Sequence, residues 1–287
     1  MLSHDLPERI RRFFYEFKLL ESACSICIKN SPIDQSRLGA TPMRLNTAEI
    51  PNRATREEIL LTLYSSLLGE VFAWSTQMDG RIINDIMPLR DYEDKMISLG
   101  SRYLFDLHSE DAFHAFPPDY FGLLCLRNPD RVATILSAVE DLDLDQHIKK
   151  ILFEPRYILK PNIIQRVTIA DSDYRPMPIL FGDKTSPYIR INTISMHAVD
   201  GDEAARNALA ILIQALKESM VDVVLEPGDA FYVDNYKAVH GRRPYQPRYD
   251  GTDRWLKRIY LTNDLRKSRS LRHSTQSRII APLGAPS

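Results

Sequence analysis

Leu107-His108-Ser109-Glu110-Asp111 places an imidazole and a carboxylate two residues apart, so both point to one face of the chain if the backbone is extended. A third metal ligand is predicted far downstream, at His240 within Ala238-Val239-His240-Gly241-Arg242. Two histidines and one carboxylate on one face of a metal leave adjacent positions open, which suits non-haem Fe(II) and its oxygen chemistry. Because His-x-Glu alone occurs by chance in many proteins, the prediction depends on the residues around it.

Short strands are predicted on both sides of this stretch, and turn residues separate them. They cover about residues 103–107, 123–128, 157–159, 163–169, 187–191 and 255–261. Residues 72–80 are predicted as a strand that runs into an Asp-Gly turn, and residues 223–233 as two strands around a Pro-Gly turn. Short strands braced by helices favour a mainly β protein with flanking helices, built as a β-sandwich or jelly roll. In a jelly roll, one strand end would carry His108 and Glu110, and a distant strand would bring His240 to the same opening.

We expect one domain over residues 1–287. Residues 1–70 are predicted to be mostly helical support, with helices over about 8–30 and 57–74 and with Cys24 and Cys27 as structural thiols in the first. Residues 71–265 would form the jelly-roll core, with helices over about 132–142 and 203–219. Residues 266–287 are basic and Ser-rich, then Pro-rich, and are predicted to be a loose tail.

The composition is that of a globular protein, with 44% hydrophobic and 26% charged residues. A net charge of −1 provides no overall attraction for nucleic acid or for an anionic membrane, so neither is expected as a partner. No signal peptide is evident, and no apolar stretch approaches the roughly 20 residues needed to span a bilayer. With only three cysteines, the chain fits a reducing compartment, and we predict a cytoplasmic protein.

Iron in such a site needs an electron donor, and the usual one is a 2-oxo acid that chelates the metal. Its distal carboxylate calls for a cation, ideally a guanidinium, because the planar fork donates two parallel hydrogen bonds. Arg254 and Arg258 both follow His240 and would share a face if residues 254–260 form a strand. One could bind the cosubstrate and the other a carboxylate of the substrate.

Several motifs in register resemble the clavaminate synthase-like branch of Fe(II)/2-oxoglutarate oxygenases, which includes hydroxylases of free L-arginine, L-asparagine and L-lysine. The resemblance covers roughly residues 68 to 268 and is far more specific than His-x-Glu alone. The residues that carry it are His108-Ser109-Glu110-Asp111-Ala112-Phe113-His114, Pro118-Asp119-Tyr120, Leu126-Arg127-Asn128, Asn235, Ala238-Val239-His240-Gly241-Arg242, Arg248-Tyr249-Asp250-Gly251 and Asp253-Arg254-Trp255.

The resemblance implies a double-stranded β-helix fold with Fe(II) and 2-oxoglutarate as cofactors and O₂ as cosubstrate. It matches His108, Glu110 and His240 to the iron ligands and catalytic centre. It also matches Arg254 to the arginine that binds the distal 2-oxoglutarate carboxylate, and Thr134 to the hydroxyl that assists it.

The same resemblance implies how the amino acid would be held. Gln77 matches a glutamine that binds the α-amino group together with the outer oxygen of Glu110, and Arg258 matches the arginine that pairs with the α-carboxylate. On its own, the position of Gln77 beside a predicted strand end is equally consistent with a simple turn residue.

One departure concerns the substrate side chain. Arginine hydroxylases of this branch carry acidic residues shortly after a Tyr-x-Arg strand, whereas here Tyr188-Ile189-Arg190-Ile191 is followed by Asn192 and Thr193. A buried guanidinium without a carboxylate partner is costly, so arginine is in doubt and a carboxamide or other polar side chain gains weight. Asn192 becomes a candidate contact for that side chain.

These observations predict a dioxygenase that hydroxylates C3, or alternatively C4, of a free L-amino acid with a basic or carboxamide side chain, in specialised-metabolite biosynthesis. Desaturation, epoxidation, cyclisation and a carrier-bound substrate remain open, as does the oligomeric state. Two remote alternatives are a zinc hydrolase that uses His108, Glu110 and His114, and a non-catalytic jelly-roll binding protein. Because Glu110 fills the third ligand position, hydroxylation is favoured over halogenation.

Overall fold

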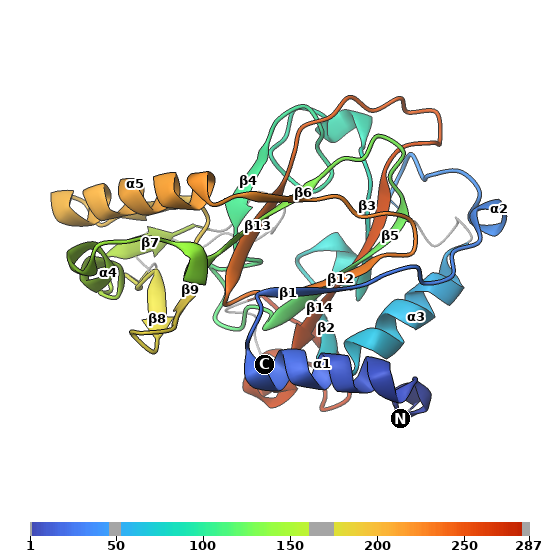
Figure 1. Ribbon diagram of the computed structural model, residues 1–287, viewed down its shortest axis with the longest axis horizontal. Helices are drawn as coiled ribbons and strands as arrows, with labels where there is room; N and C mark the ends of the chain where they lie inside the picture. The colour runs from blue at the N-terminus through green and yellow to red at the C-terminus, as the bar shows by residue number, and fades with distance from the viewer. Residues whose placement is uncertain (1, 46–52, 161–174, 283–287) are drawn as a thin grey trace.

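The computed structural model of the protein describes residues 2–45, 53–160 and 175–282 and contains many strands and few helices (Figure 1). The larger sheet has the order β1-β12-β5-β14-β2-β15, and β3 also pairs with β14. Every pairing in it is antiparallel except that between β15 and β2. Its strands are β1 (Ser25–Ile28), β2 (Glu70–Trp74), β3 (Ile83–Ile86), β5 (Tyr120–Arg127), β12 (Ala230–Asp234), β14 (Trp255–Thr262) and β15 (Ile279–Ile280).

A second, four-stranded sheet has the order β11-β6-β13-β4. Its strands are β4 (Phe105–His108), β6 (Thr134–Ala138), β11 (Val221–Val223) and β13 (Ala238–Arg242). Strand β5 is buried on both faces, because its alternating side chains enter two different apolar clusters. Phe121 and Leu123 pack with Leu136 of β6, whereas Leu124 and Leu126 pack with the N-terminal helices.

The helices fall into two groups (Figure 1). One is N-terminal and lies beside the larger sheet: α1 (Glu8–Leu20), α2 (Gln35–Leu38) and α3 (Thr55–Ser65). The other lies beside the smaller sheet and consists of α4 (Gln146–Leu152) and α5 (Glu203–Glu218). Two two-stranded sheets accompany it, β7 (Tyr157–Leu159) with β10 (Met196–Ala198) and β8 (Leu180–Gly182) with β9 (Pro187–Ile189). Short 3₁₀ helices cover Leu2–Asp5, Met78–Gly80, Arg90–Tyr92, Val139–Asp141 and Leu265–Leu271.

Helix α5 confirms the helix predicted near 203–219. Asp202 caps its first turn by accepting a hydrogen bond from the backbone N–H of Ala205 at 2.9 Å. Its buried face carries Ala205, Ala208, Leu209, Leu212 and Leu216 at helical spacing.

The first predicted helix is too long. Helix α1 ends at Leu20, where Glu21 adopts a left-handed φ of 46°. The chain then forms β1 against β12, so Cys27 lies in an edge strand of the larger sheet rather than in a helix. The second predicted helix likewise ends at Ser65, and the residues from Glu70 form β2.

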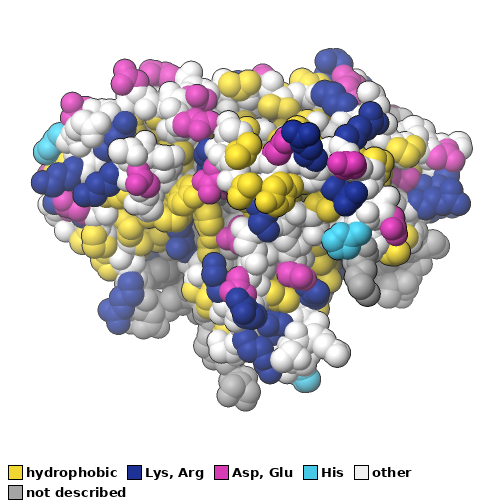
Figure 2. Space-filling view, turned by 60° about the horizontal axis from the view of Figure 1, so that its bottom comes forward, with side chains coloured by type: hydrophobic (Ala, Val, Ile, Leu, Met, Phe, Trp, Pro, Cys, Tyr) yellow, Lys and Arg dark blue, Asp and Glu magenta, His cyan; other side chains and the backbone are white. Residues whose placement is uncertain are grey.

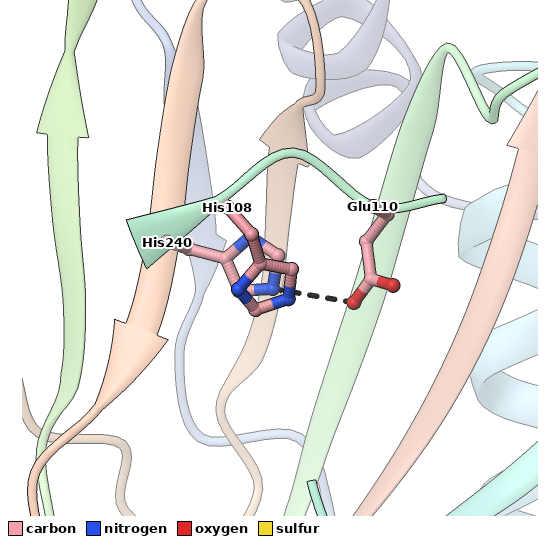
Figure 3. Close-up of side chains that lie close together, drawn as sticks. All are labelled: His108, Glu110 and His240. Atoms are coloured by element: carbon pink, nitrogen blue, oxygen red, sulfur yellow. Dashed lines mark ion pairs between the residues drawn. The ribbon is translucent and has the colours of Figure 1, made fainter. Parts of the chain in front are cut away.

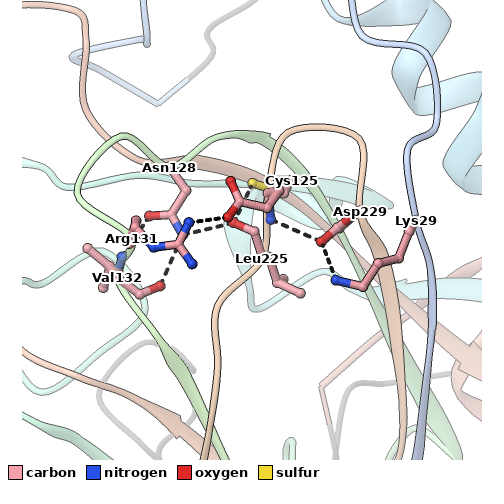
Figure 4. Close-up of polar contacts among 8 residues, drawn as sticks. Lys29, Cys125, Asn128, Arg131, Val132, Leu225 and Asp229 are labelled. Atoms are coloured by element: carbon pink, nitrogen blue, oxygen red, sulfur yellow. Dashed lines mark hydrogen bonds and ion pairs between the residues drawn. The ribbon is translucent and has the colours of Figure 1, made fainter.

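Residues 134–138 form a strand rather than the predicted helix. Strand β6 lies between β11 and β13, and this pairing outweighs the local preference of the sequence. The turn before it is closed by Asn128, which bonds both backbone groups of Val132 and the carbonyl of Leu225 (Figure 4). Asn128 thereby helps to place Thr134, the first residue of β6.

The C-terminal segment is not a loose tail over the residues that the structure describes. β15 pairs in parallel with β2, and its residue Ile280 is buried in the same apolar cluster as Phe72 and Trp74 of β2. The Arg272 guanidinium donates to the carbonyls of Thr275 at 3.0 Å and Ser277 at 2.8 Å. Residues 283–287 and the strand predicted over 163–169 lie outside the described residues.

Figure 2 shows one face of the molecule, on which acidic, basic and hydrophobic side chains are interspersed. Within the described residues, no helix has both the length and the apolar character required to cross a membrane.

Candidate active site

The three predicted metal ligands lie together, and one ligand atom from each falls within 4.8 Å of the others (Figure 3). His108 ends β4 and His240 lies in β13, and these two residues face each other in the β4–β13 pairing. Glu110 follows β4 in a turn, and all three side chains are buried. Two imidazole nitrogens and one carboxylate oxygen form a donor set that fits Fe(II).

The backbone around the ligands is held by specific contacts. The Asn235 side chain accepts a hydrogen bond from the N–H of Glu110 at 2.7 Å and donates to the carbonyls of Glu110 and Pro118. Beside His240, a Cβ at Gly241 would collide with the carbonyl oxygen of Phe105 on β4. Glycine therefore allows the close approach of β4 and β13 that brings the two histidines together.

His108 and Glu110 are oriented and charged as metal ligands require. His108 Nδ1 lies 2.9 Å from the carbonyl of Asp106, which leaves Nε2 for a metal. Burial and the neighbouring His240 lower the pKa of His108 to about 4, so the imidazole is neutral. Burial raises the pKa of Glu110, but Arg258 and the two histidines outweigh it, and the carboxyl pKa lies below its ordinary value.

Two donors approach the Glu110 carboxylate from β14. The Tyr260 hydroxyl donates to Oε2 at 2.8 Å, and Arg258 Nη1 donates to Oε1 at 3.2 Å. His240 Nε2 also lies 3.2 Å from Oε1. Oε1 is therefore the Glu110 oxygen on the side of the two histidines, and Oε2 is the outer oxygen. Arg258 and Tyr260 point the same way because they are two residues apart on one strand.

Arg254 and Arg258 line one pocket together with Glu110, Thr134 and His240. Arg254 Nη2 donates to the Thr134 hydroxyl at 3.2 Å, which joins the two residues expected to bind 2-oxoglutarate. Among the described residues, Arg254 Nε and Arg258 Nε and Nη2 are buried without a partner. Buried guanidinium donors without acceptors are costly, so the pocket is suited to anionic ligands.

Gln77 and Asn192 are absent from the described lining of this pocket. Gln77 is buried in the turn after β2, and its backbone N–H donates to the carbonyl of Trp74 at 3.1 Å. Asn192 lies beside His108 through a backbone bridge, but its side-chain oxygen accepts hydrogen bonds from Ile194 and Ser195 at 3.0 Å each. That oxygen therefore stabilises the turn over residues 192–195.

His114 is not part of the ligand group found among the described residues. Its Nδ1 accepts a hydrogen bond from the backbone N–H of Phe116 at 3.0 Å, and its ring packs edge-on to Trp74. Burial lowers the pKa of His114 to about 4. The zinc site that would use His114 is therefore not formed.

The sequence interpretation missed Tyr260, Ser98 and Arg242. Tyr260 could have been found from strand alternation, since it lies two residues beyond Arg258. Ser98 lines the pocket with a buried hydroxyl that has no partner among the described residues, and no motif marks it in the sequence. Arg242 also lines the pocket and donates to the backbone carbonyls of Gly100 and Tyr103.

Comparison with known proteins agrees with this geometry. The family model "Taurine catabolism dioxygenase TauD, TfdA family" matches residues 172–260, which contain His240, Arg254 and Arg258. Enduracididine β-hydroxylase from Streptomyces hygroscopicus is 36% identical over 98% of this chain and 89% of its own. The L-ornithine/L-arginine 3-hydroxylase of Catenulispora acidiphila is 34% identical over 96% of this chain and 87% of its own.

The fold is similar to that of the non-haem iron oxygenase OrfP. The crystal structure of OrfP with Fe and α-ketoglutaric acid matches with a TM-score of 0.91 and 40% identity over 97% of this chain and 87% of that chain. Its complex with Fe, succinate and (3S)-hydroxy-L-Arg also gives a TM-score of 0.91, over 97% of this chain and 88% of that chain. Clavaminate synthase 2 from Streptomyces clavuligerus is 28% identical over 92% of this chain. The chain therefore belongs to the clavaminate synthase-like family of Fe(II)/2-oxoglutarate-dependent oxygenases.

Proposed function

We propose that the protein hydroxylates C3 of a free L-amino acid with a basic side chain, at Fe(II) held by His108, Glu110 and His240. When bound, the iron with 2-oxoglutarate and O₂ supplies the oxidant that functionalises an unactivated C–H bond. The protein contributes the ligand set, two anion-binding arginines and a buried cavity. Arg254 with Thr134 would hold the distal carboxylate of 2-oxoglutarate.

The observation that carries this proposal is the arrangement of donors on Arg258. Nη1 donates a hydrogen bond to Glu110. Nε and Nη2 form one edge of the guanidinium, and both are buried without a partner among the described residues. This edge matches the two oxygens of a carboxylate. An α-carboxylate bound there would lie beside the metal ligand Glu110, so the side-chain carbons of the amino acid would be presented to the metal.

We assign the α-amino group to Gln77 and to the outer oxygen of Glu110, and the unpartnered hydroxyl of Ser98 to the α-carboxylate beside Arg258. Tyr260 donates to the same outer oxygen, which has a second lone pair for the ammonium group. Holding both α-substituents restricts which carbon faces the metal, and a misplacement of about 1 Å can cost on the order of 100-fold in rate.

The basic side chain is supported by the relatives whose names give their substrates, enduracididine and ornithine or arginine. Asn192 stands where arginine hydroxylases of this branch carry an acidic residue, which argues against arginine as the substrate. The sequence identity of 36% and 34% to relatives that act on basic amino acids argues for it. We therefore place arginine and related amino acids first, with Asn192 near the side-chain end of the substrate, and carboxamide amino acids second.

We further propose that the two facing sheets form the double-stranded β-helix of the family and that residues 1–287 make one oxygenase domain. Support comes from β1 and β15, which add strands from the N-terminal and C-terminal segments to the same larger sheet. The match of relatives over nearly the whole chain agrees with this.

The test is succinate release by anaerobically Fe(II)-loaded protein given 2-oxoglutarate and O₂, across the twenty L-amino acids, ornithine, citrulline and enduracididine. We expect one or a few basic amino acids to stimulate succinate formation and to gain about 16 Da. A product lighter by about 2 Da would indicate desaturation or cyclisation instead. Succinate that no free amino acid stimulates would move the substrate to a carrier-bound form, and no succinate at all would refute the proposal.

The matched variants are His240→Ala and His197→Ala. His240 belongs to the ligand group, whereas His197 is exposed on β10. We expect the first to abolish succinate release and the second to leave it unchanged.

A further inference from the structure

The three ligand side chains are oriented by different means. His108 has a hydrogen bond from its ring to the carbonyl of Asp106, and Glu110 has hydrogen bonds from Tyr260 and Arg258. His240 directs Nε2 toward Glu110, but its Nδ1 is buried and has no partner among the described residues. A ligand imidazole ordinarily donates this second N–H to a carboxylate, a carbonyl or water, which sets its orientation.

Aromatic contacts surround His240 instead. The ring centroids of Phe121 and His240 are 4.2 Å apart, with an interplanar angle of 37°. The ring centroids of His240 and His108 are 4.4 Å apart, and those of His108 and Phe105 are also 4.4 Å apart. Phe105, His108, His240 and Phe121 thus form a four-ring stack that runs from the smaller sheet to the larger one.

Phe121 is well placed to act as a rigid support. It is fully buried in β5, the strand that pairs with both β12 and β14. Its register partners are Val233 and Tyr260. Phe105 at the other end of the stack is only half-buried and contacts the histidine that already has a hydrogen bond.

We propose that Phe121 is the positioning residue for His240 and that its ring contact takes the place of the missing hydrogen bond. The inference rests on the proposed function, because it assumes that His240 is a metal ligand. Aromatic ring pairs have preferred geometries, so the tilted contact with the Phe121 ring limits rotation of the imidazole about its χ angles. Phe121 also lines the pocket that Arg254 and Arg258 share, so its role in orienting His240 is tested by metal binding in the absence of substrate.

The test compares Phe121→Leu with Phe231→Leu. Both phenylalanines are buried in the same apolar cluster, but Phe231 has no ring contact with either histidine. Co(II) alone is titrated anaerobically into the full-length apoprotein, and its visible absorption reports both affinity and ligand geometry. Loss of an outer contact of a metal ligand typically weakens metal binding roughly 10- to 100-fold, and we expect this range for Phe121→Leu.

Phe231→Leu should bind Co(II) within about threefold of the unchanged protein, even if both variants lose similar thermal stability. Phe105→Leu should also change the affinity little, because His108 keeps its hydrogen bond. Equal Co(II) affinity and spectra for Phe121→Leu and Phe231→Leu would overturn the inference. Should Phe121→Leu not fold, Phe121→Met removes the ring with less change in volume and carries the same expectation.

The two proposals fail in different ways. If the unchanged protein binds neither Co(II) nor Fe(II), the proposed function itself is wrong. If the unchanged protein binds Co(II) and Phe121→Leu binds it equally well, only the role of Phe121 is wrong.

Discussion

Replacing Arg258 by lysine should separate binding of the amino acid from binding of 2-oxoglutarate. Lysine keeps the positive charge near Glu110 but cannot present the parallel Nε and Nη2 donors that are buried without partners in the structure. One charge-assisted hydrogen bond to the substrate carboxylate is lost, at about 1.5–3 kcal/mol. At 1.4 kcal/mol for each factor of ten, kcat/KM for the amino acid should fall roughly 10- to 100-fold.

KM for 2-oxoglutarate should change by less than about threefold, because Arg254 with Thr134 forms a separate carboxylate site. Arg254→Lys should give the reverse pattern, with a raised KM for 2-oxoglutarate. The assay is succinate formation with one substrate varied and the other saturating. Arg243→Lys serves as the control, since Arg243 pairs with Asp222 at the surface.

The reasoning would be refuted if Arg258→Lys raised both KM values equally, or if it raised only that for 2-oxoglutarate. Either result would mean that the two arginines do not divide the two carboxylates between them. A fall in Co(II) affinity without a change in either KM would assign Arg258 to Glu110 alone.

Three further outcomes follow from single contacts. Tyr260→Phe removes the donor to Glu110 Oε2 and should weaken Co(II) binding roughly 10-fold, whereas Tyr232→Phe, another buried hydroxyl, should not. Gly241→Ala forces a Cβ against the carbonyl of β4 and should lower the free energy of unfolding by about 1–3 kcal/mol in urea titrations. The pKa of His114, lowered by burial from 6.5 to about 4, should make the apoprotein lose about 3 kcal/mol of stability as pH falls from 6.5 to 4, because the unfolded state binds the proton first. His114→Asn should remove this part of the pH dependence and leave the part that the buried His108 contributes, and an unchanged slope would refute the role of His114.

Even spacing in and just before β14, which begins at Trp255, made part of the site predictable. Arg258 and Arg254 were expected to share a face, and both line the same pocket. The helix over Glu203–Glu218 was predictable because its apolar residues recur at helical spacing and Asp202 provides a cap. These features depend on residues close together in the chain, so a local pattern is enough to reveal them.

Long-range pairing overrode other local patterns. Residues 134–138 were predicted as helix, but β11 and β13 flank them and convert them to a strand. The same holds for β1 and β15, whose short segments gain stability only by adding to a sheet built from distant strands. No periodicity in so short a segment can predict such a pairing.

The sequence by itself determined the chemistry: an imidazole and a carboxylate two residues apart, a distant second imidazole and two arginines spaced for one strand face. These are properties of residue type and spacing, which the chain carries before it folds. The tertiary structure alone decided how two of the ligands are contacted. The Tyr260 hydroxyl donates to Glu110 and the ring of Phe121 contacts His240, because strands far apart in the sequence meet at the metal site. The contact of His108 with the carbonyl of Asp106 is local, because both residues lie in β4.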